Sequence, residues 1–408
     1  SIGAGWKSIR SFASSSSGIL VATRIGAWLA SVADTVLIDE PENDDHKQDE
    51  LAPRYDARWI VRKSAELRPE LRVCTFGVTP RLEEHGMAPP INVHLSLEVW
   101  RRRSGSAIET LSPQSVQDIE TALEHDREIF ILHPVRGVRS RVSCRDCGWR
   151  AICSACGWNL SLGVAHAFCK RCGRRADLPS ACPSCGGTDF SRGLPGAERL
   201  SEQCAAYFKT DRVRVGDIMG MDSDERRSTC LPTGTTSDAR SLILITDLSL
   251  LSGATEDIRR RERLIIAWRR IAATAASSGA ELRVQGPEEL LAECRAWLTS
   301  DGLARAWKKE MDDRHLFGFP PATRLVKLLV DGDSSIAEVV RSDVQQGIPS
   351  EWNVRGPYPV AYRSITRTSR HVLQLIAPRE TSDQKLTSVL APFTSRAYID
   401  IDPISFFS

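Results

Sequence analysis

Short apolar runs alternate with amphipathic stretches over the first hundred residues of the chain. Residues 18–24, 35–40 and 71–80 are apolar runs that end in polar residues, which is typical of buried strands. Residues 57–66 have the period of an amphipathic helix, and residues 1–12 predict a short one. Strands that alternate with helices pair in parallel, so this part of the chain predicts β–α–β units.

A second region with the same alternation follows a polar linker at residues 101–115. It predicts a helix at 115–125, a strand at 128–132, a helix that opens after residue 193 and a buried strand at 241–246. A cysteine-rich stretch lies between the first of these strands and the helix after it. That stretch is therefore an insertion in a second α/β unit.

Residues 256–276 predict a helix with one apolar face and an opposite face dense in arginine. Such a face is either solvated on a packed helix or available to contact DNA. We favour the solvated face.

From residue 317 onward the pattern changes to that of a small α+β domain. Strands are predicted at 324–330, 371–376 and 397–402, helices at 334–345 and 382–391, and a turn at Gly356. The chain as a whole predicts an α/β protein in four parts: a partial first unit at 1–105, a second unit at 106–140 and 190–311, a cysteine module at 141–189, and a C-terminal α+β domain at 312–408.

Composition and charge narrow the class of protein further. The 408 residues are 41% hydrophobic and 26% charged, as in ordinary globular proteins. The net charge of +2 is too small to indicate nucleic-acid binding by the chain as a whole. Arg24 and Asp34 interrupt the apolar stretch 18–38, so it does not predict a membrane span. No signal peptide is recognisable, and a chain that begins at Ser1 without methionine is expected of a fragment.

The cysteines carry the most specific chemistry. Four Cys-x-x-C knuckles fall within the 42 residues from Cys144 to Cys185, and eight thiolates suit two tetrahedral Zn²⁺ sites. The alternatives are reduced structural cysteines or a disulfide framework. The other four cysteines are scattered, which fits a protein of the reducing cytoplasm: Cys74, Cys204, Cys230 and Cys294.

Two pairings of the knuckles are open. A nested pairing places Cys144, Cys147, Cys182 and Cys185 around one zinc ion, and Cys153, Cys156, Cys169 and Cys172 around the other. A cross-braced pairing would interleave the knuckles instead. In either case a site of four cysteines leaves no position for water, so we expect structural rather than catalytic zinc.

Asp39 and Glu40 end the predicted strand at 35–40, where sites in parallel sheets lie. Two carboxylates in that place are the Walker B arrangement, in which Asp holds Mg²⁺ and Glu orients water. The printed sequence contains no G-x-x-x-x-G-K-[ST] loop for the phosphates of a nucleotide, so binding of ATP and Mg²⁺ by this chain is doubtful.

The order of these pieces resembles the PriA family of primosomal replication-restart proteins. The most specific match is C-R-D-C-G-W at 144–149 with the knuckles after it. The further matches are A-T-R-I-G-A at 22–27, D-E-P-E at 39–42, K-Q at 47–48, P-R-Y-D-A-R at 53–58, G-V-T-P at 77–80, the segment 193–200, F-P-P at 319–321, G-P at 356–357 and D-I-D-P at 400–403.

The resemblance implies a superfamily 2 helicase fold with two RecA-like lobes, the first incomplete here, and a two-zinc module inserted in the second. It also implies the nested zinc pairing. Where the family has an arginine finger, this chain has Arg269 and Arg270 in a different context, and Pro41-Glu42 replaces the last two residues of the D-E-E-H box. A further family segment is replaced by residues 246–253. These departures imply a relative that has kept the fold and lost the ATP motor, with Asp39 and Glu40 vestigial and no enzymatic activity.

Three functions follow as hypotheses. The first is a scaffold that binds branched or fork DNA and recruits primosome and single-strand-binding proteins, so that the replicative helicase is reloaded. Its candidate DNA contacts are Arg54, Tyr55, Arg58 and Trp59, although Trp59 could equally belong to a helix core. The second is an active ATP-dependent 3′–5′ helicase whose Walker A loop lies outside this chain. The third is a zinc adaptor without DNA binding.

Overall fold

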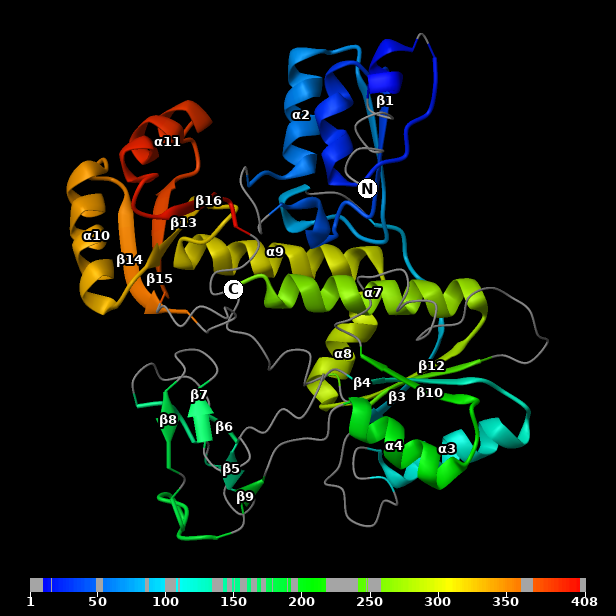
Figure 1. Cartoon of the computed structure of the whole chain (residues 1–408). Helices are drawn as coiled ribbons and strands as arrows, with labels where there is room; N and C mark the ends of the chain where they lie inside the picture. Colours follow the sequence, from blue (N-terminus) through cyan, green and yellow to red (C-terminus); the bar gives the residue numbers. More distant parts are fainter. Residues whose placement is uncertain are drawn as a thin grey trace.

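The computed structural model describes residues 10–15, 17–48, 54–84, 88–99, 108, 111–133, 142–144, 149, 151–154, 160–162, 167–169, 174–177, 179–188, 190–191, 197–217, 241–246, 248, 258–360 and 370–403. These residues form a mixed α/β protein in four parts (Figure 1). Two long helices, α7 and α9, run across the middle, with a small sheet on one side of them and a larger parallel sheet on the other.

The first part is the predicted β–α–β unit. Strand β1 (Thr35–Asp39) pairs in parallel with β2 (Arg72–Phe76), and helix α2 (Ala57–Leu67) connects them. The 3-10 helix η1 (Arg24–Ser31) and α2 cover one face of this sheet. Four buried side chains form its core: Ala30, Ile38, Val61 and Leu71.

The predicted strand at residues 18–24 is wrong. Ile19 and Val21 are more than nine-tenths exposed, and the 3-10 helix η1 begins at Arg24. A strand needs a neighbour for its backbone hydrogen bonds, and the described part of the sheet holds β1 and β2 alone. Helix residues 10–14 agree with the predicted N-terminal helix, whose first nine residues lie outside the described chain.

The second part is a five-stranded sheet in which every strand is parallel to its neighbours. Its order is β10 (Val213–Asp217), β4 (Ile129–His133), β11 (Leu242–Ile245), β12 (Glu281–Gly286) and β3 (His94–Val99). Helices α3 (Pro113–Glu124) and α4 (Ala197–Phe208) pack on one face. The other face carries α7 (Arg260–Ser278), α8 (Glu288–Ala296) and α9 (Ser300–Phe317).

The boundary predicted at residue 105 is wrong, because β3 belongs to the second sheet. Its six residues pair with β12 in a continuous parallel register. A polar cluster holds the two strands at their carboxyl ends, where Gln285 Nε2 donates to Glu98 Oε2 at 2.8 Å and lies 2.7 Å from Ser112 Oγ. The chain therefore passes from the first part to the second before residue 94.

The third part is the cysteine module between β4 and α4, where the sequence placed an insertion. Its described residues form short antiparallel pieces. These are β5 (Ser143–Cys144) with β9 (Phe190–Ser191), and β6 (Leu160–Leu162), β7 (Ala167–Cys169) and β8 (Arg175–Ala176).

The fourth part is the C-terminal domain, with the element order of a ferredoxin-like fold. Its elements are β13 (Thr323–Asp331), α10 (Ser334–Gly347), β14 (Asn353–Pro359), β15 (Arg370–Pro378), α11 (Asp383–Leu390) and β16 (Tyr398–Ile401). The antiparallel sheet order is β14-β15-β13-β16, and both helices pack on one face of it. The predicted turn at Gly356 is wrong, because Gly356 lies inside β14 at an irregularity between Arg355 and Tyr358.

A buried charge cluster joins α7, α9 and the segment that enters the second part. Glu262 Oε2 on α7 lies 3.2 Å from Arg259 Nη1 and 3.1 Å from Arg314 Nη2 on α9. The backbone N–H of Leu82, in the 3-10 helix η3 (Leu82–Glu84), donates to the same carboxylate at 3.4 Å. The side chains of Glu262, Arg259 and Arg314 are all more than nine-tenths buried.

The prediction that the arginine-dense face of α7 is solvated is wrong. That face is not solvated, since Arg259 and Arg269 are buried and Arg270 is mostly covered. It lies against the loops of the first part, since Arg269 Nη2 donates to Val78 O at 3.3 Å and Arg270 Nη2 lies 3.2 Å from Glu40 Oε2.

Replacing Glu262 with Ala should be strongly destabilising, because it leaves buried arginines without their shared carboxylate. The expected cost is about 3–5 kcal/mol in the free energy of unfolding. Glu338→Ala is the matched control, since Glu338 pairs with Arg341 at 2.8 Å on the surface of α10 and should contribute less than about 1 kcal/mol. Urea unfolding followed by circular dichroism measures both, and equal losses would contradict the assignment.

Candidate metal centre and carboxylate loop

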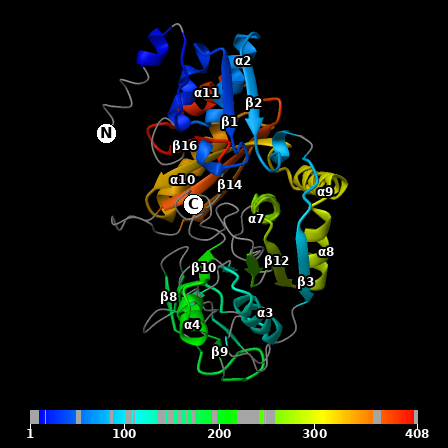
Figure 2. The ribbon, with the colours of Figure 1, turned by 90° about the vertical axis from the view of Figure 1, so that its right-hand side faces the viewer.

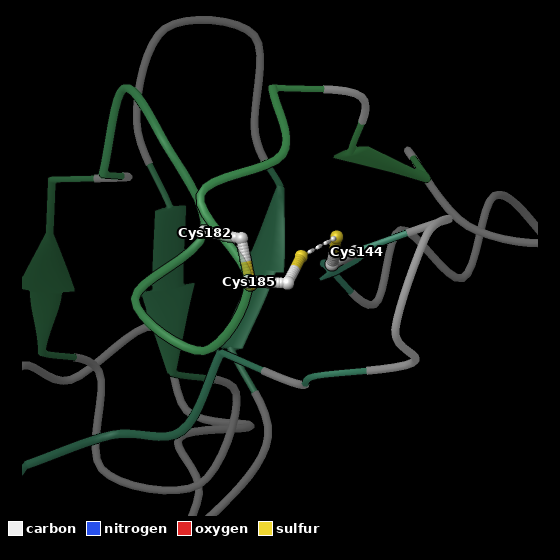
Figure 3. Close-up of side chains that lie close together, drawn as sticks. All are labelled: Cys144, Cys182 and Cys185. Atoms are coloured by element: carbon white, nitrogen blue, oxygen red, sulfur yellow. Dashed lines mark hydrogen bonds between the residues drawn. The ribbon is translucent and has the colours of Figure 1, made fainter.

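Three cysteine sulfurs meet in the third part of the structure. The Sγ atoms of Cys144, Cys182 and Cys185 all lie within 4.8 Å of one another, and those of Cys144 and Cys185 are 3.6 Å apart (Figure 3). Cys144 and Cys182 are buried, whereas Cys185 is exposed. Thiolates grouped in this way could hold a metal ion, and sulfur ligands favour zinc.

The backbone around Cys182 explains how the sulfurs come together. The N–H of Gly186 donates to Cys182 O at 2.8 Å, and Cys182 N–H donates to Gly187 O at 2.7 Å, so the chain turns tightly after Cys185. Gly186 has a φ of 77°, a conformation that glycine adopts without strain. The N–H of Ser184 points to Cys182 Sγ at 3.4 Å, as expected where a thiolate is stabilised.

The three cysteines come from the first and fourth knuckles. This is the grouping that the nested pairing requires for its first ion, whose fourth ligand, Cys147, lies outside the described residues. Of the second proposed set, Cys153 and Cys169 are buried in one small apolar cluster. Their partners Cys156 and Cys172 lie outside the described chain.

The predicted carboxylates lie at the carboxyl end of β1. Asp39 is the last residue of the strand and is exposed, and Glu40 follows it with a φ of 47°. The ring nitrogen Nε2 of His46 lies 3.0 Å from Asp39 O and 3.2 Å from Glu40 O, which folds the loop back on the strand end. Within the described residues, no group of three metal-ligating side chains includes Asp39 or Glu40.

The carboxylate loop, defined here as residues 39–47, is bound by arginines of α7. Arg270 Nη2 lies 3.2 Å from Glu40 Oε2, and Arg270 Nε lies 3.3 Å from Glu42 Oε1. Arg263 Nε pairs with Asp44 Oδ2 at 2.8 Å. Sequence reasoning named Arg270 only as the remnant of an arginine finger and missed these contacts.

Arg269, its neighbour on α7, has a different role. Its guanidinium donates to the carbonyls of Trp297 at 2.6 Å and Pro89 at 2.8 Å, and it is fully buried. Burial lowers the pKa of Arg269 from its usual value. Arg269 therefore holds together backbone segments and is not directed at the carboxylates.

The same loop is tied to the C-terminal domain. Lys47 Nζ lies 3.0 Å from Asp400 Oδ1 and donates to Ile401 O at 2.7 Å. Both charged side chains are at least 96% buried, and Asp400 is on strand β16. A buried ion pair of this kind fixes the position of the loop against the domain, because neither charge is solvated.

The four predicted DNA contacts are near one another in sequence and differ in environment. Arg58 donates to Pro41 O at 2.6 Å and to Asn43 O at 3.0 Å, so its guanidinium holds the carboxylate loop. Tyr55 is half-buried and packs edge-on against Trp28, with ring centroids 5.3 Å apart. Trp59 is 37% exposed, with Lys63 Nζ 5.9 Å from its ring centre, and Arg54 is half-buried.

Asp56 caps α2 and pairs with Arg58. Its Oδ1 accepts from the backbone N–H of Arg58 at 2.9 Å, and its Oδ2 from Arg58 Nη2 at 2.6 Å. Burial alone would raise the pKa of Asp56, but the hydrogen bonds and charge of Arg58, with the charge of Arg81, lower it to about 2. The carboxylate therefore stays ionised well below the pH at which a solvated Asp is protonated.

Taken together, these parts define a multi-part α/β protein with a cysteine-rich insertion that could hold a metal ion. Residues 315–404, which include β13 to β16, match the family model of the primosomal protein N C-terminal domain. None of the described helices is long and apolar enough to cross a membrane.

Curated relatives that share one name are similar to nearly the whole chain. The chain is 24% identical over 427 residues to the replication restart protein PriA of Thermotoga maritima, a match that covers 94% of this chain and 56% of that protein. It is 22% identical over 419 residues to PriA of Rickettsia felis, which covers 91% of this chain and 64% of that protein. The resemblance to PriA is confirmed, and the chain spans between about half and two thirds of the length of these relatives.

The ion pair of Asp56 gives a pH-dependent stability. The folded-state pKa is depressed, so the stabilisation is present above the unfolded value near 3.8 and is lost as the pH falls towards about 2. Asp56→Asn keeps a capping side chain and removes the charge. Near neutral pH we expect the variant to be less stable by about 2 kcal/mol, and by progressively less below pH 4. Urea unfolding at several pH values would show a constant difference if the charge had no role.

Loss of one sulfur should remove a metal ion. Cys185→Ser is expected to hold about one zinc ion fewer per chain than the wild type, because the site then lacks one of its thiolates. Cys74→Ser is the matched control, since Cys74 is an exposed cysteine on β2 outside the knuckles. Elemental analysis of purified protein gives both counts. Equal zinc contents would show that Cys185 is not a ligand.

Proposed function

We propose that this protein is a replication-restart scaffold that binds branched or fork DNA and recruits primosome and single-strand-binding proteins, without a helicase activity of its own. Similarity to PriA proteins over 91–94% of the chain supports the restart role. We infer two RecA-like lobes. Strands β1 and β2 are part of the first lobe, and the five-stranded sheet is the sheet of the second. We also infer that the protein is cytoplasmic.

The contacts of the carboxylate loop support a scaffold over a motor. In a motor, a carboxylate such as Glu40 has to orient water beside a nucleotide. Here Glu40 Oε2 instead lies 3.2 Å from Arg270 Nη2 and accepts from Asn43 Nδ2 at 3.3 Å. Arg269 is occupied by backbone carbonyls. Glu40, Arg269 and Arg270, which stand where a motor would have its ATP site, are thus used for contacts that hold the parts of the protein together.

We propose two structural zinc ions in the cysteine module, paired as the nested arrangement requires. The first would be held by Cys144, Cys147, Cys182 and Cys185, and the second by Cys153, Cys156, Cys169 and Cys172. The grouping of Cys144 with the fourth knuckle supports this pairing. The metal would contribute local folding energy and present the module to partner proteins.

DNA binding by this scaffold would rely on backbone phosphates and on stacking, with preference for branched structure rather than sequence. In the first part, Trp59 and Arg54 are the best-placed of the predicted contacts, since Arg58 holds the carboxylate loop and Tyr55 packs on Trp28. The exposed ring of Trp28 adds a further stacking surface beside Tyr55.

A second candidate function is supported by one observation. Asp39 is exposed at the carboxyl end of β1, which is the position of a metal-binding Asp in an ATPase. This hypothesis is an ATP-dependent helicase, and it requires the ion pairs of Arg270 to open when a nucleotide binds.

Fork-DNA binding measured by fluorescence anisotropy, with and without ATP and Mg²⁺, distinguishes the two. We expect tighter binding to a fork than to duplex or single strand, a fall in affinity with rising salt, and no effect of nucleotide. Affinity or unwinding that changes with ATP would favour the helicase. A complete lack of DNA binding would overturn the scaffold and leave the zinc adaptor.

Trp59→Ala should weaken fork binding by about 1–3 kcal/mol without changing its salt dependence, because it removes stacking and not a phosphate contact. Tyr207→Ala is the matched control, since Tyr207 is a similarly exposed aromatic residue on α4 of the second part. An unchanged affinity in the Trp59 variant would remove this residue from the proposed surface.

A further inference from the structure

The three grouped sulfurs of the candidate metal centre differ in their access to solvent. Cys185 is exposed, whereas Cys144 and Cys182 are buried. Cys144 Sγ lies 3.6 Å from Cys185 Sγ, and the three Sγ atoms are all within 4.8 Å of one another (Figure 3). A reagent dissolved in water therefore reaches Cys185 first and finds a second sulfur beside it.

Metal binding keeps these sulfurs in their reactive form. A cysteine binds zinc as the thiolate, and the thiolate is also the form that acts as a nucleophile and is oxidised by peroxides. Two described cysteines of the second proposed set have different surroundings, because Cys153 and Cys169 are buried in an apolar cluster with Leu160 and Ala167. Cys185 thus combines exposure with the thiolate state that the proposed zinc site imposes.

We propose that Cys185 is an oxidation site, at which hydrogen peroxide converts the first metal site into a disulfide between Cys185 and Cys144. The oxidised module keeps its first and fourth knuckles joined, by a covalent bond in place of the ion. The inference rests on the zinc sites of the proposed function and goes beyond them to a chemical modification of the protein.

The reaction has two steps, which balance in atoms and electrons. In the first step Cys185 Sγ attacks one oxygen of the peroxide, the O–O bond breaks, and the hydroxide that leaves takes up a proton to form water. In the second step Cys144 Sγ attacks the sulfenic sulfur of Cys185, an S–S bond forms, the S–O bond breaks, and the hydroxide that leaves is protonated to a second water. Two thiolates lose two electrons, the peroxide is reduced to two waters, and Zn²⁺ dissociates because two of its ligands are lost.

Cys144 is a better partner for the oxidised Cys185 than Cys182 is. The sulfurs of Cys144 and Cys185, now 3.6 Å apart, have to approach by about 1.5 Å to reach the length of an S–S bond. Cys182 Sγ instead accepts a hydrogen bond from the backbone N–H of Ser184 at 3.4 Å, which lowers its nucleophilicity. The backbone also holds Cys144 in place, because strand β5 pairs with β9, where Cys144 lies opposite Phe190. The disulfide therefore forms with little movement of the chain.

Treatment of the zinc-loaded full chain with hydrogen peroxide tests the inference. We expect release of about one zinc ion per chain, followed with a chromogenic chelator, and rebinding after reduction with dithiothreitol and addition of zinc. Trypsin leaves Cys144 in peptide 142–145 and both Cys182 and Cys185 in peptide 176–192. Mass spectrometry should detect these two peptides cross-linked, with fragmentation placing the bond on Cys185.

Cys74 is the matched control, since it is an exposed cysteine on β2 and belongs to no group of metal-ligating side chains among the described residues. Dimedone traps sulfenic acids, so Cys74 should be labelled, whereas Cys185 should escape the label because Cys144 reacts with it first. Cys74→Ser should release zinc as the wild type does. Cys185→Ser should release no zinc at a peroxide concentration that empties the first site of the wild type. If Cys185→Ser does not fold, the peptide map of the wild type decides the question.

Three outcomes would overturn the inference. They are a disulfide confined to peptide 176–192, zinc release without the cross-link between Cys144 and Cys185, and oxidation of Cys74 at a peroxide concentration that leaves Cys185 and the zinc content unchanged. The zinc content before peroxide treatment tests the proposed metal sites by itself, and fork binding tests the scaffold. A failure of either is therefore distinguishable from a failure of Cys185 to be oxidised.

Discussion

The carboxylate of Glu262 is the contact on which the arrangement of the parts depends. It lies in the interior beside Arg259, the N-cap residue of its own helix, and Arg314 of α9, with Arg81 Nε 3.9 Å away. Arg81 precedes η3 on the way into the second part, and Arg314 also donates to Pro320 O at the start of the C-terminal domain. Three parts of the chain therefore meet at one buried negative charge. Desolvating so many charges is costly, so the stabilisation depends on complete pairing rather than on any single contact.

The arginines along α7 are paired in the same way. Arg259, Arg263 and Arg270 each pair with a carboxylate from another part of the chain, and Arg269 donates to backbone carbonyls. A helix that is rich in arginine is thus a junction and not a basic surface. This is consistent with the net charge of +2, because charges that are used inside the protein do not add to an electrostatic field outside it. Figure 2, turned by 90°, shows α7 between the first part and the five-stranded sheet in a second view.

Sequence patterns predicted those features that depend on local spacing. The β–α–β unit around Ala57–Leu67, the insertion of the cysteine module and the C-terminal α+β domain all follow from periodicity or from knuckle spacing. The errors concern partners that are distant in sequence. An apolar run such as 18–24 forms a strand only if another strand lies beside it, and β3 pairs with a strand nearly 190 residues later. The contacts of Glu42 were also missed, since nothing in D-E-P-E shows that the second Glu is buried against Gly77 and paired with Arg270.

The uncovered face of the β1–β2 sheet has a consequence for the chain in solution. Leu37 is 64% exposed and Phe76 55% exposed, and they lie with Cys74 on the side of the sheet away from α2. Parallel sheets normally have helices on both faces and strands at both edges. Among the described residues β1 and β2 pair only with each other, and Leu37 and Phe76 stay exposed, so chains at high concentration have a template for pairing with one another. Aggregation of the chain should accordingly begin at this sheet, while the well-packed five-stranded sheet remains folded.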